Sequence, residues 1–161
     1  MIMRQRCFIL LLLIFWSFEQ TEAQPLVGTN AFPLSAKNPI GKVISLDSFQ
    51  GKWVLLDFWA SWCGPCRLSN RAVRKFYPKW KDKGIEVFGV SLDENRSAWI
   101  KAIKSDKITW PQVNIDAKWD SPLITNWQIE RIPTTFLIDP AGKIRAIDPD
   151  PGAILSFIST H

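Results

Sequence analysis

Residues 53–66 read WVLLDFWASWCGPC, and this stretch decides the fold. Residues 53–60 are apolar except for Asp57, a pattern typical of a central β-strand that is covered on both faces. Pro65 suits the first turn of a helix, because the N–H that proline lacks would have no partner there. We therefore predict a buried strand over residues 53–60 and a helix from about Gly64, with two cysteines at their junction.

The cysteines at this junction, Cys63 and Cys66, have the spacing of a redox-active pair. Two cysteines separated by two residues can close a disulfide when the second lies one helical turn beyond the first. Free N–H groups and the dipole at a helix N-terminus favour a negative sulfur, so we expect Cys63 to have a lowered pKa and to be the exposed nucleophile. Cys66 would lie deeper and would attack the mixed disulfide that Cys63 forms.

Other uses of such a pair fit the sequence poorly. A structural zinc site needs four nitrogen or sulfur ligands, whereas this cluster offers two. A c-type haem site needs a histidine directly after the second cysteine, but Arg67 stands there, and the one histidine, His161, ends the chain. A disulfide ring this small constrains little chain entropy, which argues against a purely structural role. We predict no metal and no organic cofactor.

Length and composition indicate one globular domain. The chain has 161 residues, of which 47% are hydrophobic and 22% are charged. This is too apolar for a disordered chain and too mixed for a protein with many membrane spans. The net charge of +5 falls short of what would indicate nucleic acid as a partner.

The first 23 residues have the layout of a secretory signal peptide. Arg4 and Arg6 precede an apolar run over residues 7–18, and the small residues Thr21 and Ala23 predict cleavage after Ala23. As a helix the run would be about 18 Å long, short of a hydrocarbon core of about 30 Å. We predict a signal peptide at 1–23 and an exported domain at 24–161, periplasmic if the source is Gram-negative. An uncleaved signal that anchors the protein in the membrane is the alternative.

The rest of the chain predicts a sheet with helices on its faces. Residues 24–38 have no clear period and are expected to form a loose extension. We predict further strands at 43–46, 85–92, 110–115, 134–138 and 143–147, and further helices at 96–105, 122–127 and 153–159, with Asp93 or Asn95 as the cap of the first of these. In the first helix, Pro78 should kink or end the helix near Tyr77. Its buried stripe is expected to be Leu68, Ala72, Val73, Phe76 and Trp80.

Two segments resemble those of a known family. Residues 57–66, DFWASWCGPC, closely resemble the active-site segment of thioredoxins, and residues 132–136, IPTTF, resemble their cis-proline loop. The signal segment, the additional residues between 92 and 127 and the hairpin signature at 139–142 are similar to the exported TlpA/ResA-like branch. The resemblance spans about residues 30–161. It implies an α/β, thioredoxin-like three-layer sandwich with a central mixed β-sheet and helices on both faces.

The resemblance also implies roles for single residues. Pro133 would be cis and lie against the cysteine pair, while the backbone of Ile132 would pair with an extended substrate segment. Trp62 is expected to form part of the substrate-facing surface because it is adjacent to Cys63, not because of the resemblance. Asp57 would lie behind the pair and help to deprotonate Cys66, and as a lone buried carboxylate it should have a raised pKa.

One position departs from the branch, because Ser69 stands where many exported members have a glutamate three residues after the second cysteine. A function tied to that glutamate is therefore not expected here. Asp57 is the available proton acceptor in its place.

These observations predict an exported thiol–disulfide oxidoreductase that reduces protein disulfides. Its partners would be disulfide-containing proteins and a thiol electron donor, in the membrane or outside it. The Gly-Pro dipeptide between the cysteines matches that of thioredoxin, which indicates the reducing direction. A thiol peroxidase of peroxiredoxin type is one alternative, although Leu56 and Ala60 stand where its Pro and Thr/Ser should be. A non-catalytic binding or chaperone module is the other.

Overall fold

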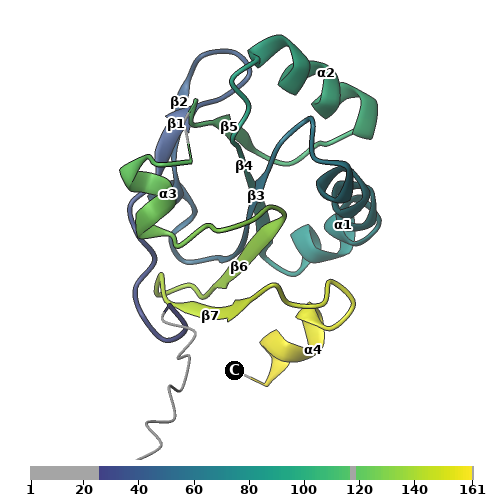
Figure 1. The fold of residues 1–161 in the computed structure, drawn as a ribbon. Helices are drawn as coiled ribbons and strands as arrows, with labels where there is room; N and C mark the ends of the chain where they lie inside the picture. Colours follow the sequence, from purple (N-terminus) through teal and green to yellow (C-terminus); the bar gives the residue numbers. More distant parts are fainter. Residues whose placement is uncertain (1–25, 117–118, 161) are drawn as a thin grey trace, which may run out of the picture.

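The computed structural model describes residues 26–116 and 119–160 (Figure 1). The predicted signal peptide, residues 1–23, and His161 lie outside them. The strands are β1 (Ser35–Lys37), β2 (Val43–Ser45), β3 (Trp53–Trp59), β4 (Ile85–Ser91), β5 (Gln112–Asn114), β6 (Thr134–Ile138) and β7 (Ile144–Ile147). The helices are the 3-10 helix η1 (Leu46–Phe49) and the α-helices α1 (Gly64–Asp82), α2 (Arg96–Asp106), α3 (Pro122–Asn126) and α4 (Ile154–Ser159). Over the described residues no helix has both the length and the apolar character that crossing a membrane requires.

The strands form one mixed sheet in the order β2-β1-β5-β4-β3-β6-β7. β3 runs parallel to β4 and antiparallel to β6, so Asp57 lies opposite Gly89 on one side and Thr135 on the other. Helices α1 and α2 lie on one face of the sheet and α3 lies on the other (Figure 1). The predicted α/β three-layer sandwich with a mixed sheet is therefore confirmed.

Successive residues of β3 point into two separate cores. Leu55 and Trp59 pack under α1 and α2, whereas Leu56 and Phe58 pack on the α3 face. Residues two apart on a strand share a face, so Asp57 points toward α1, as Leu55 and Trp59 do. This alternation explains why the strand reads as almost continuously apolar.

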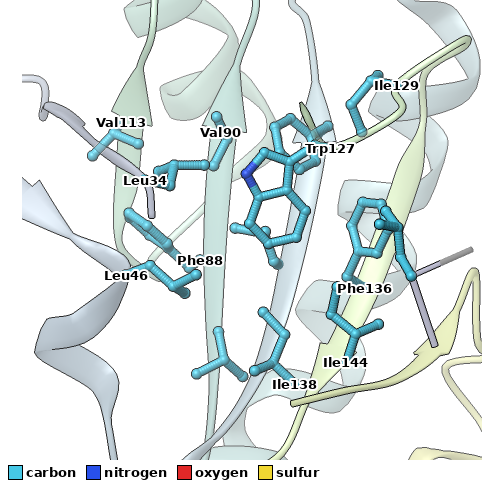
Figure 2. Close-up of a cluster of buried hydrophobic side chains, with 14 of the residues drawn as sticks. Leu34, Leu46, Phe88, Val90, Val113, Trp127, Ile129, Phe136, Ile138 and Ile144 are labelled. Carbon is cyan, nitrogen blue, oxygen red and sulfur yellow. The ribbon is translucent and has the colours of Figure 1, made fainter. Parts of the chain in front are cut away.

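Trp127, which follows α3, fills the centre of the second core (Figure 2). Its side chain is fully buried. Its ring centroid lies 5.1 Å from that of Phe136, 5.6 Å from that of Phe58 and 5.8 Å from that of Phe32. The side chain thereby packs the end of α3 against β3, β6 and the N-terminal segment.

The first of three differences from the predicted elements lies in the N-terminal segment. β1 falls within residues expected to form a loose extension, and it pairs with β2 to form a hairpin. Asn38 closes the turn, because its Oδ1 accepts the N–H groups of Ile40 and Lys42. A strand of three residues is too short to give an alternating pattern in the sequence.

The other two differences concern α1. The helix does not end near Tyr77, because it continues past Pro78 to Asp82. Pro78 is exposed, so water can satisfy the carbonyl that its missing N–H leaves without a partner. The predicted stripe is confirmed only in part: Val73 and Trp80 are buried, whereas Leu68 is 64% exposed and Ala72 and Phe76 are half-buried. The other buried positions of the helix are Cys66, Asn70 and Tyr77. The buried face therefore begins at Cys66.

We expect Trp127→Ala to lower the free energy of unfolding by about 3–5 kcal/mol, the usual cost of emptying a large aromatic site. Denaturant unfolding followed by circular dichroism would measure it. Trp119→Ala is the matched control, because Trp119 is 47% exposed and its loss should change the stability little. Equal effects of the two substitutions would contradict this account of the core.

Candidate active site

Cys63 and Cys66 form a disulfide at the start of α1, with an S–S distance of 2.03 Å. Cys63 is the N-cap residue, and its Sγ accepts the backbone N–H of Cys66 at 3.2 Å. The structure corrects one expectation: in this oxidised state Cys63 is only 6% exposed, against 1% for Cys66. The disulfide draws its sulfur toward Cys66, and Ile132 packs against the cluster that contains both cysteines.

The loop before the pair is held by Asp93, which follows β4. Its carboxylate accepts the backbone N–H of Ser61 at 2.8 Å and the hydroxyl of the same residue at 2.5 Å. The hydroxyl of Ser91 donates to it as well, at 2.7 Å. Asp93 is not the cap of α2, because Asn95 takes that place. Its role is to fix the chain two residues before Cys63.

The loop before β6 lies against the disulfide. The Ile132–Pro133 peptide is cis, as expected. The carbonyl oxygen of Ile132 lies 3.8 Å from the Sγ of Cys63. Trp62, directly before Cys63, is 61% exposed. The structure thus brings Ile132 and Pro133 to the cysteine pair and leaves an exposed indole beside it.

Asp57 is a buried carboxyl group on the same face of the sheet as the cysteines. It is 1% exposed, and neither carboxyl oxygen has a hydrogen-bond partner among the described residues. Burial raises the pKa of Asp57 to about 7, and repulsion from Asp148 adds to the rise. A carboxylate with this pKa can take up and release a proton near neutral pH.

Two residues beside Asp57 were not found from the sequence. Asp148, at the end of β7, accepts the backbone N–H of Thr135 and a guanidinium N–H of Arg131, each at 2.7 Å. Thr135 is the strand partner of Asp57 on β6, so the Arg131–Asp148 ion pair lies next to the strand position opposite Asp57. Loop residues carry no periodic signal, so the sequence alone does not bring them to the site.

Two buried amides were also missed. Asn70 lies in α1 one turn beyond Cys66, is fully buried, and has no hydrogen-bond partner for either amide atom among the described residues. Gln112 lies in β5 and is 4% exposed. The spacing of four residues from Cys66 could have revealed Asn70. Gln112 had no such signal.

No group of three or more His, Cys, Asp or Glu in residues 26–116 and 119–160 is placed to hold a metal ion. Ser69 faces a cleft that Arg131, Pro133 and Asp148 also line. The chemistry that this arrangement supports is thiol–disulfide exchange at the Cys63–Cys66 pair.

A thioredoxin-like domain with a helix-capping disulfide defines the class of this protein, and comparison with known proteins gives its family. Residues 27–147 match the AhpC/TSA family, and the chain belongs to that family. It is 38% identical over 104 residues to the thiol-disulfide oxidoreductase ResA of Bacillus thuringiensis subsp. konkukian, covering 65% of this chain and 58% of ResA. It is 32% identical over 117 residues to ResA of Bacillus subtilis, covering 73% of this chain and 64% of that protein. The chain thus spans less than two thirds of the length of these relatives.

A solved structure supports the same assignment. The thioredoxin domain of a thiol-disulfide oxidoreductase from Bacteroides vulgatus superposes with a TM-score of 0.75 at 34% identity. The match covers 83% of this chain and 96% of that domain. The resemblance to thioredoxins and to the ResA-like branch, first drawn from residues 57–66 and 132–136, is therefore confirmed.

We expect Asp57→Asn to stabilise the oxidised protein at about pH 8 by roughly 4 kcal/mol, because burial raises the pKa of Asp57 from 3.8 to about 7. An acid with a raised folded-state pKa binds more protons folded than unfolded, so wild-type stability falls as pH rises from about 4 through 7. Denaturant unfolding across this range should show the difference between the two proteins growing with pH. Asp47→Asn, at an exposed carboxylate, is the control. A difference that is independent of pH would contradict the raised pKa.

Proposed function

We propose that this protein is an exported thiol–disulfide oxidoreductase that reduces disulfides in other proteins. The observation that carries the proposal is the Cys63–Cys66 disulfide at the N-terminus of α1, packed against the Ile132–Pro133 loop. An exported protein works where disulfides form and persist, which supplies substrates. The signal-like segment at residues 1–23 supports export.

The reaction begins with the dithiol form. The thiolate of Cys63 attacks one sulfur of a substrate disulfide, a mixed disulfide forms, and the other substrate sulfur leaves as a thiolate that takes up a proton. Asp57 accepts the proton of the Cys66 thiol, and the Cys66 thiolate then attacks the Sγ of Cys63. The second substrate sulfur leaves as a thiolate that takes up a proton, and Asp57 releases the proton it took from Cys66, so the substrate has gained two electrons and two protons. The protein then holds the Cys63–Cys66 disulfide. A thiol electron donor must reduce this disulfide before the next cycle.

Substrate would bind over the exposed side of the pair. The half-buried Ile132 precedes the cis peptide beside Cys63, so its backbone can pair with an extended substrate strand. The exposed indole of Trp62 offers an apolar surface next to the reacting sulfur. Recognition through backbone pairing suits a protein that acts on different sequences.

The peroxidase alternative has less support. Leu56, which stands where a peroxiredoxin-type segment has proline, is fully buried in the core on the α3 face, whereas the cysteines belong to the core on the α1 face. Peroxide consumption by the reduced protein, compared with Cys63→Ser, tests this alternative directly. Consumption at a rate above that of disulfide reduction would favour it.

Cys63→Ser should abolish reduction of insulin disulfides, whereas Cys66→Ser should accumulate a mixed disulfide with substrate, because the resolving sulfur is missing. Insulin turbidity and mass spectrometry of trapped adducts measure the two outcomes. In the full chain, Cys7→Ser is the control and should leave the activity unchanged. Full activity of Cys63→Ser would contradict the mechanism and would leave the binding or chaperone module as the better reading.

The Gly-Pro dipeptide between the cysteines leads us to expect a midpoint potential near that of thioredoxin, about −270 mV. Equilibration with glutathione and dithiothreitol buffers, read by thiol alkylation, would measure it. A midpoint above about −150 mV would contradict the reducing direction.

A further inference from the structure

Buried polar side chains without partners gather in the layer between the sheet and α1. The side chains in this layer that keep at least one polar atom unpaired among the described residues are Asp57, Asn70, Trp99, Trp110 and Gln112. Buried polar groups normally have a hydrogen-bond partner, so such a cluster needs a reason. The carboxyl oxygens of Asp57 are acceptors, whereas Asn70, Trp99, Trp110 and Gln112 each offer a donor. Of these donors, Gln112 is the one on a residue that shares the strand partner Gly89 with Asp57.

The amide of Gln112 has a fixed orientation. The indole Nε1 of Trp59 donates to the Oε1 of Gln112 at 2.9 Å, and an indole N–H can only donate. The Oε1 atom is therefore identified as the oxygen, and Nε2 is left as the free end. Both side chains are buried, so exchange with bulk water does not compensate that donor.

Gly89 is the residue over which this amide lies. A Cβ on Gly89 would lie 2.0 Å from the Nε2 of Gln112, closer than any real contact. Gly89 is the partner of Gln112 on β5 and also the partner of Asp57 on β3. Paired residues share a face of the sheet, so the Gln112 side chain extends over the glycine toward Asp57. Strand spacing is about 4.8 Å, which puts Nε2 within about 7 Å of the Asp57 Cβ.

We propose that Gln112 is a positioning residue whose Nε2–H is linked through one water to the ionised Asp57 carboxylate, since the two groups face each other across Gly89 without a direct hydrogen bond. Gly89 is required because any side chain there would fill the space that the amide crosses. A donor to the charged form favours ionisation, so Gln112 opposes burial and the repulsion from Asp148. This inference rests on the proposed function, in which Asp57 takes the proton of Cys66.

Other groups around Asp57 do not replace this donor. The titratable and charged residues on the packed elements include Cys63 at the cap of α1, Cys66, Arg67, Arg71 and Tyr77 of α1, Glu86 of β4, Asp106 of α2, and Arg131 and Asp148 near β6 and β7. The others on these elements are exposed or half-buried: Arg74, Lys75, Lys79, Lys81, Asp82, Arg96, Lys101, Lys104 and Arg145. The guanidinium of Arg67 is bound to Asp106, and Tyr77 donates to Glu86. The guanidinium of Arg131 is bound to Asp148. Arg71 lies 3.7 Å from Asp106 as well, so Arg67, Arg71 and Arg131 all pair with carboxylates other than Asp57.

The first test uses the wild-type protein. In an NMR titration of the oxidised protein, the side-chain amide signals of Gln112 should shift with the same midpoint as the carboxyl carbon of Asp57. The shift should vanish in Asp57→Asn. Gln112 signals that stay constant through the Asp57 midpoint would overturn the proposal, whether or not the protein reduces disulfides.

The second test uses variants. Gln112→Met keeps the length of the side chain but removes the donor, and Gly89→Ala displaces the amide. Both should raise the midpoint of Asp57 by about one pH unit. Val113→Ala is the matched control, because Val113 is the next residue of β5 and points to the opposite core. It should lower the stability but leave the midpoint unchanged.

Activity measurements distinguish failure of the proposed role of Gln112 from failure of the proposed function. The pH profile of insulin reduction should move upward with Gln112→Met, and in an Asp57→Asn background the same substitution should have no further effect on the profile. A shift that persists without Asp57, or an unchanged midpoint in both folded variants, would overturn the role of Gln112. Absence of reduction by the wild type would instead overturn the proposed function and leave the NMR test standing.

Discussion

The pairing of β3 with a strand on each side is the constraint on which the site depends. β3 is hydrogen-bonded to β4 and β6, and it is covered by helices on both faces, so its register cannot slip without exchanging the two cores. That register sets Asp57 between Gly89 and Thr135 and ends the strand where the chain turns into α1. The cysteines therefore take their position from a strand that is paired on both sides.

A carboxyl group in this position is costly to the fold. It has no partner among the described side chains, and its pKa of about 7 measures how strongly the surroundings oppose its charge. A leucine at this point of β3 would satisfy the core better. The acid at this position fits the proton transfer that we propose for Asp57. Stability and reactivity thus conflict at one residue.

The sequence predicted the elements with strong patterns and missed features that depend on tertiary contacts. The continuous apolar run of β3 and the cysteine spacing at the start of α1 predicted both elements correctly. Asp57, Ile132 and Pro133 were predicted from the resemblance to thioredoxins. β1 was missed because three residues show no period. Asn70, Gln112 and Asp148 were missed because nothing local marks a polar side chain that a remote strand brings to the site. The near-complete burial of Cys63 depends on packing by Ile132, which no local pattern encodes.

The sulfur of Cys63 is both the reacting atom and the cap of α1, since it accepts the N–H of Cys66. A charged acceptor binds such an N–H more strongly than a neutral sulfur does. The opening turn of the helix is consequently held most firmly when the thiolate is free and more loosely once that sulfur is bonded to another. Local order at this end of the helix thereby follows the oxidation state of Cys63.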